Sequence, residues 1–132
     1  MRGYLVRADE AAILVGNDEM IWPGIAMGAS GLVSSLANLF PELYVQLFEA
    51  CDAGDQGRAR ELQRWVWRLA EVCHRATPLA YVKRGLAILG IDVGEPLPPL
   101  RDLSAAETAA LERDLRAFQE GWNRVFREGG GS

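Results

Sequence analysis

The sequence predicts an α/β chain in which a short βαβ unit precedes a mostly helical region. A continuous apolar run, Ala11-Ala12-Ile13-Leu14-Val15, stops at the turn residues Gly16-Asn17-Asp18. A run of this kind is typical of a strand buried on both faces of a parallel sheet. A glycine-rich stretch, residues 28–42, holds a second short apolar segment, and helical periodicity dominates the chain after it. These three observations predict the fold class.

The βαβ unit is expected to occupy residues 11–35. After the first strand, a helix over 19–27 is kept short or kinked by Pro23-Gly24, and a second strand covers 31–35. Either Asn17 or Asp18 could cap this helix, because both side chains accept hydrogen bonds from backbone amides.

Four amphipathic helices are expected after the βαβ unit. Pro41 suits a first helical position because its missing amide proton would be unpaired there in any case. Ser104 and Glu107 form a capping box for the last helix, and residues 94–100 form a proline-rich connector. We expect the connector to be a rigid strap over a helix rather than a polyproline ligand. The predicted inward residues are Leu43, Tyr44, Leu47, Phe48 and Cys51, then Ala59, Leu62, Val66, Leu69 and Cys73, then Leu79, Val82, Leu86 and Leu89, and finally Leu111, Leu115, Phe118, Trp122 and Val125.

The composition excludes several classes of partner. A net charge of -4 gives no basic surface for nucleic acid or anionic lipid. No apolar run approaches the ~20 residues needed to span a bilayer, and the N-terminus does not resemble a signal peptide. The two cysteines, Cys51 and Cys73, are expected to be buried free thiols in a reducing compartment. We therefore expect a cytoplasmic protein that binds neither nucleic acid nor membrane.

The residues that could carry chemistry are few. His74 is the only histidine, which excludes a metal site of several imidazoles, and its expected role is to cap a helix C-terminus. Lys83 is the only lysine, but its position beside Arg84 in an amphipathic helix predicts a solvated ammonium group rather than a nucleophile. Asp18 and Glu19 follow the first strand, where α/β folds place ligands, although helix capping explains them equally well. We predict no catalytic residue, no cofactor and no metal.

Several segments resemble the dihydrodipicolinate synthase / N-acetylneuraminate lyase family. Residues 13–19, residues 28–38 and Pro41-Glu42 resemble its final strands, in that order. Residues 53–63, residues 82–90 and Pro98-Pro99-Leu100 resemble its C-terminal region. Members of this family are (β/α)8 TIM barrels with additional C-terminal helices, and they form or cleave carbon-carbon bonds to pyruvate through a lysine Schiff base.

The resemblance implies a partial TIM barrel made of the last two parallel strands and a C-terminal helical region, mostly helical overall. The implied domains are the terminal βαβ portion at 1–40, the helices at 41–127 and a flexible Gly/Ser tail at 128–132. The family's Schiff-base lysine, its tyrosine partner and its substrate hydroxyl loop lie on earlier strands and have no counterpart here. We therefore expect the chain to be inactive alone.

The resemblance also implies a set of substrate-binding positions. The loop after strand seven carries a Gly-x-Asp-Glu pattern similar to that of lyases that grip the hydroxyls of sugar acids, and strand eight lines the pocket. The matching residues are Gly16, Asn17, Asp18, Glu19, Val33 and Ser35.

Two interpretations remain open. The chain is either the C-terminal part of a pyruvate-dependent lyase or aldolase, or a non-catalytic helical module for oligomerisation or scaffolding. In the first case, pyruvate or another 2-keto acid or sugar acid binds only when the N-terminal half is supplied. Two parallel strands leave both sheet edges unpaired, so we also expect a homo-oligomer.

Overall fold

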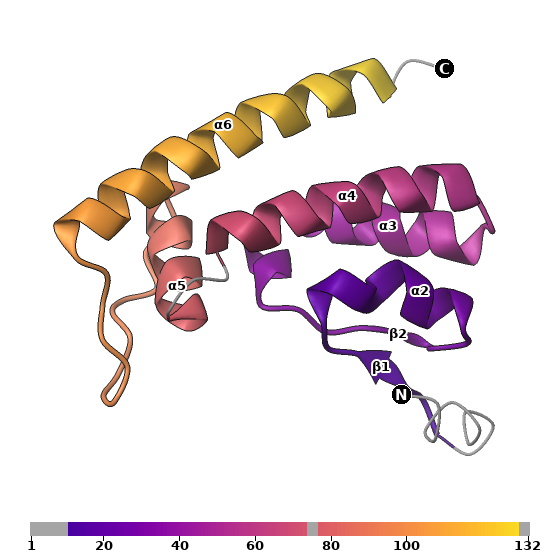
Figure 1. The fold of residues 1–132 in the computed structure, drawn as a ribbon, viewed down its shortest axis with the longest axis horizontal. Helices are drawn as coiled ribbons and strands as arrows, with labels where there is room; N and C mark the ends of the chain where they lie inside the picture. Colours follow the sequence, from indigo (N-terminus) through magenta and orange to yellow (C-terminus); the bar gives the residue numbers. More distant parts are fainter. Residues whose placement is uncertain (1–10, 74–76, 130–132) are drawn as a thin grey trace. The chain divides into compact units, whose positions relative to one another are not determined.

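The structure is a computed structural model that describes residues 11–73 and 77–129 (Figure 1). The chain falls into two compact units, divided between Trp67 and Arg68 within helix α4 (Gln56–Cys73). The predicted boundary between 40 and 41 coincides with the start of helix α3 (Pro41–Asp52). The division into domains there remains a prediction.

The first unit contains the expected βαβ arrangement. Strands β1 (Leu14–Val15) and β2 (Gly31–Leu32) are parallel, and Leu14 pairs with Gly31. They are joined by the 3-10 turn η1 (Asp18–Met20) and helix α2 (Ile21–Ala26), and Gly28, two residues beyond the helix, has a positive φ of 102°. Both strands are shorter than predicted.

Only one face of this sheet is covered. Val15 is buried on the face that helix α2 contacts, whereas Leu14 is 54% exposed. Side chains alternate along a strand, so Leu14, its partner Gly31 and Val33 share the opposite face, where Val33 is 61% exposed. The prediction of a strand buried on both faces is therefore wrong, because no described element packs on the second face.

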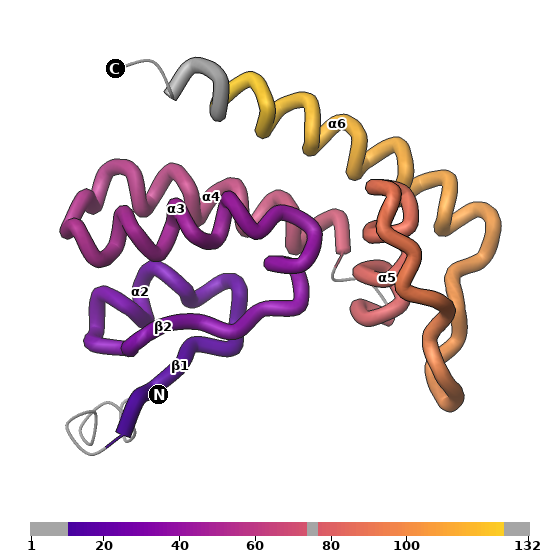
Figure 2. Tube along the Cα trace, turned by 180° about the vertical axis from the view of Figure 1, so that it is seen from behind, coloured from indigo at the N-terminus to yellow at the C-terminus, as the bar shows by residue number. Residues whose placement is uncertain are grey.

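Helices α3 and α4 complete the first unit as far as Trp67. The 3-10 turn η2 (Leu36–Asn38) leads into α3, which begins with Pro41 as predicted. Helix α3 and this part of α4 run side by side in both views (Figures 1 and 2), and Arg58 donates a hydrogen bond to Gln46 across them at 3.0 Å. The predicted inward residues Leu43, Tyr44, Leu47, Ala59, Leu62 and Val66 are buried, while Phe48 and Cys51 are half-buried.

The second unit pairs helix α5 (Pro78–Ile88) with helix α6 (Ala105–Gly129). Most predicted core positions are confirmed as buried: Leu69, Cys73, Val82, Leu86, Leu111, Leu115, Phe118 and Trp122. Leu89 and Val125 are half-buried. The prediction for Leu79 is wrong, since it is 46% exposed: the buried arc of α5 centres on Tyr81, Val82, Gly85 and Leu86, and Leu79 falls at its edge. Helix α6 continues to Gly129, and the rest of the predicted tail lies outside the described residues.

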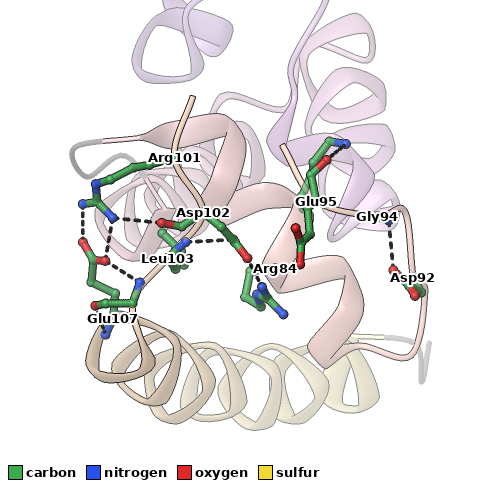
Figure 3. Close-up of polar contacts among 10 residues, drawn as sticks. Arg84, Asp92, Gly94, Glu95, Arg101, Asp102, Leu103 and Glu107 are labelled. Atoms are coloured by element: carbon green, nitrogen blue, oxygen red, sulfur yellow. Dashed lines mark hydrogen bonds and ion pairs between the residues drawn. The ribbon is translucent and has the colours of Figure 1, made fainter. Parts of the chain in front are cut away.

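The connector between α5 and α6 is tied to α5 by side chains. The Lys83 ammonium group donates to the carbonyl oxygens of Val93 and Glu95 at 3.4 and 3.1 Å. Arg84 forms an ion pair with Asp102 near the other end of the connector (Figure 3). The connector is thus a strap on its own helix, as predicted.

The capping box at the start of α6 is confirmed. The Glu107 amide donates to Ser104 Oγ at 3.3 Å, and the Ser104 amide donates to the Glu107 carboxylate at 2.8 Å. Arg101 adds two hydrogen bonds to the same carboxylate at 2.7 and 2.8 Å (Figure 3). These hydrogen bonds lower the pKa of Glu107 to about 2, and the bond from Arg101 has the largest effect.

We predict that Leu47→Ala lowers the free energy of unfolding of the first unit by about 2–5 kcal/mol, because the truncation leaves a cavity around a fully buried side chain. Urea denaturation followed by circular dichroism measures the change. Val45→Ala is the matched control on the same helix, since Val45 is exposed and its loss should cost within about 0.5 kcal/mol. Equal losses for the two variants would contradict the assigned core.

The capping carboxylate gives a pH-dependent prediction. Because folding lowers the pKa of Glu107 from 4.5 to about 2, its charge stabilises the fold above the unfolded value, and this contribution is lost as pH falls between them. Glu107→Gln should therefore reduce stability at neutral pH and match the wild type near the lower pKa. Thermal melts across this range test the convergence, and a constant difference would contradict it.

Candidate functional site

Two loops meet at the carboxyl-terminal edge of the sheet. Residues 16–19 follow β1 and residues 33–35 follow β2, and the strands are parallel, so both loops leave the sheet at the same edge. Open α/β sheets bind ligands at this edge. A hydrogen bond from Ser34 Oγ to Asp18 Oδ1 joins the two loops directly.

Asp18 is the inward-facing centre of this edge. Asp18 is only 5% exposed. Its Oδ1 also accepts a 2.7 Å hydrogen bond from the Tyr44 hydroxyl of α3. Its main-chain carbonyl accepts a second 2.7 Å bond, from Gln63 Nε2 of α4. A buried carboxylate needs such donors, because leaving it unpaired would be costly.

Gln63 connects this loop to the start of helix α2. The side chain is completely buried, and while Nε2 donates to Asp18, Oε1 accepts a 2.9 Å bond from the Trp22 amide. Two tryptophans add hydrogen bonds between α4 and this segment. Trp67 Nε1 donates to the Glu19 carbonyl at 3.1 Å, and Trp22 Nε1 donates to Gln56 at 2.9 Å. Gln56, Gln63 and Trp67 lie seven and four residues apart on α4, which places them along one helix face.

The six predicted substrate-binding residues divide into two groups. Asp18 points into the protein, whereas the other five are exposed: Gly16, Asn17, Glu19, Val33 and Ser35. Asn17 is the residue that caps η1, with its Oδ1 accepting the Glu19 amide at 2.9 Å. Ser35 uses its carbonyl to accept a bond of 2.9 Å from the Asn38 side chain. The exposed group is the part of the edge that could contact a ligand.

Sequence reasoning missed three residues of this cluster: Ser34, Tyr44 and Gln63. The sequence pattern predicts Tyr44 only as part of the apolar face of α3. Gln63 carried a usable signal, because it falls within the apolar stripe of α4 between Leu62 and Val66. A glutamine at such a position needs buried partners.

The other side chains with potential reactivity are Lys83, Cys51 and His74. Lys83 is half-buried, and its ammonium group donates exposed hydrogen bonds to two carbonyl oxygens. Burial raises the pKa of the Cys51 thiol, which disfavours a nucleophilic thiolate. Residues 11–73 and 77–129 contain no group of three or more histidines, cysteines or carboxylates able to hold a metal. Within the same residues, no helix is both long and apolar enough to cross a membrane. His74 lies outside the described residues.

Comparison with known proteins identifies the family. The model of the dihydrodipicolinate synthetase family matches residues 4–118. This chain belongs to that family. It is 43% identical over 106 residues to a DapA-like lyase of Halobacterium salinarum, covering 80% of this chain and 35% of the relative. It is 42% identical over 111 residues to a 4-hydroxy-tetrahydrodipicolinate synthase of Streptomyces coelicolor, covering 83% and 35%.

Solved structures agree with the sequence comparison. The chain superposes on KD(P)GA from T. tenax with a TM-score of 0.80 at 29% identity, covering 91% of this chain and 43% of that one. The predicted fold class, a partial TIM barrel with a C-terminal helical region, is confirmed. The chain spans about a third of the length of the curated relatives that it matches.

We predict that Ser34→Ala costs about 1–3 kcal/mol of stability, because it removes a donor from the buried Asp18 carboxylate. Ser35→Ala is the adjacent control: Ser35 is exposed and its bond to Asn38 uses the main chain, so its change should stay within about 0.5 kcal/mol. Urea denaturation of both variants gives the comparison. Indistinguishable midpoints would contradict the role of Ser34.

Proposed function

We propose that this chain is the C-terminal portion of a Schiff-base, pyruvate-dependent lyase or aldolase. In this proposal residues 1–132 supply the last two barrel strands and the helical region, while the imine-forming lysine belongs to the N-terminal part of the barrel, outside these residues. The membership of a lyase family and the chain's coverage of about a third of its relatives support the proposal.

The observation that carries the proposal is the open sheet face. Leu14 and Val33 expose apolar side chains there, and in a complete TIM barrel the corresponding face is packed inside the barrel. A Cβ atom at Gly31 would lie 3.2 Å from Leu14 Cδ2, so glycine leaves room for Leu14 across this face. An exposed apolar face of this kind marks a surface that is covered by another segment or chain, and in this proposal the remaining barrel strands cover it.

The exposed loop residues would form one side of the substrate pocket. Asn17 and Glu19 offer an amide and a carboxylate that can bind hydroxyl groups of a 2-keto sugar acid, and Val33 and Ser35 would line the pocket floor. Asp18 would support this surface from within. We further propose that the complete enzyme is a cytoplasmic homo-oligomer.

Borohydride trapping tests whether Lys83 forms an imine with pyruvate. Incubation of the chain alone with pyruvate and borohydride should leave its mass unchanged, because Lys83 is held by the carbonyl oxygens of the connector. Mass spectrometry reads the result, and Lys83→Arg is the control for any adduct that does form. A stable adduct on Lys83 would sink the assignment.

Complementation in trans tests the proposed portion. The N-terminal strands of a family member, supplied as a separate chain, should restore a borohydride-stable pyruvate adduct on their own lysine and restore lyase turnover. Binding without an adduct or turnover would instead favour the scaffolding module.

A further inference from the structure

The main chain of the loop after β1 is held from several sides. Gln63 binds the carbonyl of Asp18, Trp67 binds the carbonyl of Glu19, and the Asn17 side chain accepts the Glu19 amide. Two of these three partners come from α4, more than forty residues further along the chain. The loop conformation therefore depends on a tertiary contact as well as on its own cap.

The side chain at the centre of the loop is held too. Tyr44 from α3 and Ser34 from the neighbouring loop both donate to Asp18 Oδ1. With Asp18 fixed inward, the residues on either side, Asn17 and Glu19, are exposed at the sheet edge.

We infer that Gln63 and Tyr44 are positioning residues of the substrate surface, which hold Asp18 so that Asn17 and Glu19 face the ligand. This inference rests on the proposed function for the identity of that surface. The ligand group that Asn17 and Glu19 would orient is a hydroxyl of a polyhydroxylated 2-keto acid, because the Asn17 Nδ2 group can donate to a hydroxyl and the Glu19 carboxylate can accept from one. Neither positioning residue contacts the ligand.

The burial of Gln63 argues for this role over simple core packing. An apolar side chain would fill the stripe of α4 without having to satisfy an amide, and a buried amide stabilises only when its hydrogen bonds are made. Gln63 makes one bond at each end, to Asp18 and to Trp22. Groups held by packed, rigid helices position a site more accurately than a loop can alone.

The first test uses the chain alone. Gln63→Leu should speed hydrogen exchange at the Glu19 and Trp22 amides by about tenfold, because it removes a bond on the loop and on the start of α2. Amides in the middle of α3 should keep their protection. Gln46→Leu is the matched control, since it removes a side-chain bond to Arg58 within the same unit but outside the loop. Unchanged exchange at Glu19 in Gln63→Leu would overturn the inference.

A second variant provides a pH signature that loss of packing would not give. In Gln63→Glu, the charged carboxylate can still accept from Trp22 but cannot donate to the Asp18 carbonyl. The protonated acid can do both. Burial raises the pKa of such a group in the folded state, so protection at Glu19 should return toward the wild-type value as pH is lowered through it, after correction for intrinsic exchange. Protection that stays low at every pH would contradict the hydrogen-bonding role.

The complemented enzyme then tests the proposed function and the positioning role separately. Gln63→Leu and Tyr44→Phe should each raise KM for a 2-keto sugar acid by about tenfold while the pyruvate adduct forms as in the wild type. Gln46→Leu should leave both unchanged. If wild-type mixtures form no adduct at all, the proposed function fails. If the adduct forms but KM does not change in the variants, the positioning role alone fails.

Discussion

The first unit depends on a buried carboxylate. Asp18 lies where the chain leaves β1, and its partners come from β2's loop, from α3 and from α4. Because an unpaired polar group in the interior is costly, β2's loop and α3 must meet the Asp18 carboxylate, and α4 must meet its main-chain carbonyl. Strands β1 and β2 are short, and the bond from Ser34 to Asp18 links the loops that follow them. Gln63 extends the same arrangement to the first turn of α2.

The uncovered face of the sheet has exposed apolar side chains, in contrast to the buried polar side chain of Asp18. Apolar burial stabilises a sheet only on faces that are covered, and here one face remains open with Leu14 and Val33 exposed. An isolated pair of strands is only marginally stable. Here the pair is stabilised by packing of α2 on β1 and by the hydrogen bonds from Ser34 and Tyr44 to Asp18. The chain spans about a third of its relatives' length, and in the proposed enzyme the rest of the barrel covers this face.

The second unit relies on a different device. Helices α5 and α6 pack through apolar faces, but the connector between them is fixed mainly by cationic side chains, with Lys83 on carbonyl oxygens, Arg84 on Asp102 and Arg101 on Glu107. Exposed ion pairs contribute little individually, so their effect is to choose the path of the connector rather than to stabilise the fold strongly. This use of Lys83 also gives the chain's only lysine a structural role that needs no Schiff base.

The sequence by itself determined the family, the order of the helices and where several of them begin. Pro41, Pro78 and the Ser104–Glu107 capping box act within one or two turns, and local interactions of that kind can be read from spacing alone. Only the tertiary structure decided that Asp18 faces inward, that Gln63 binds it, and that the sheet is covered on one face. The partners of Asp18 lie 16, 26 and 45 residues away. Nothing in local periodicity specifies which distant side chain a buried polar group will meet.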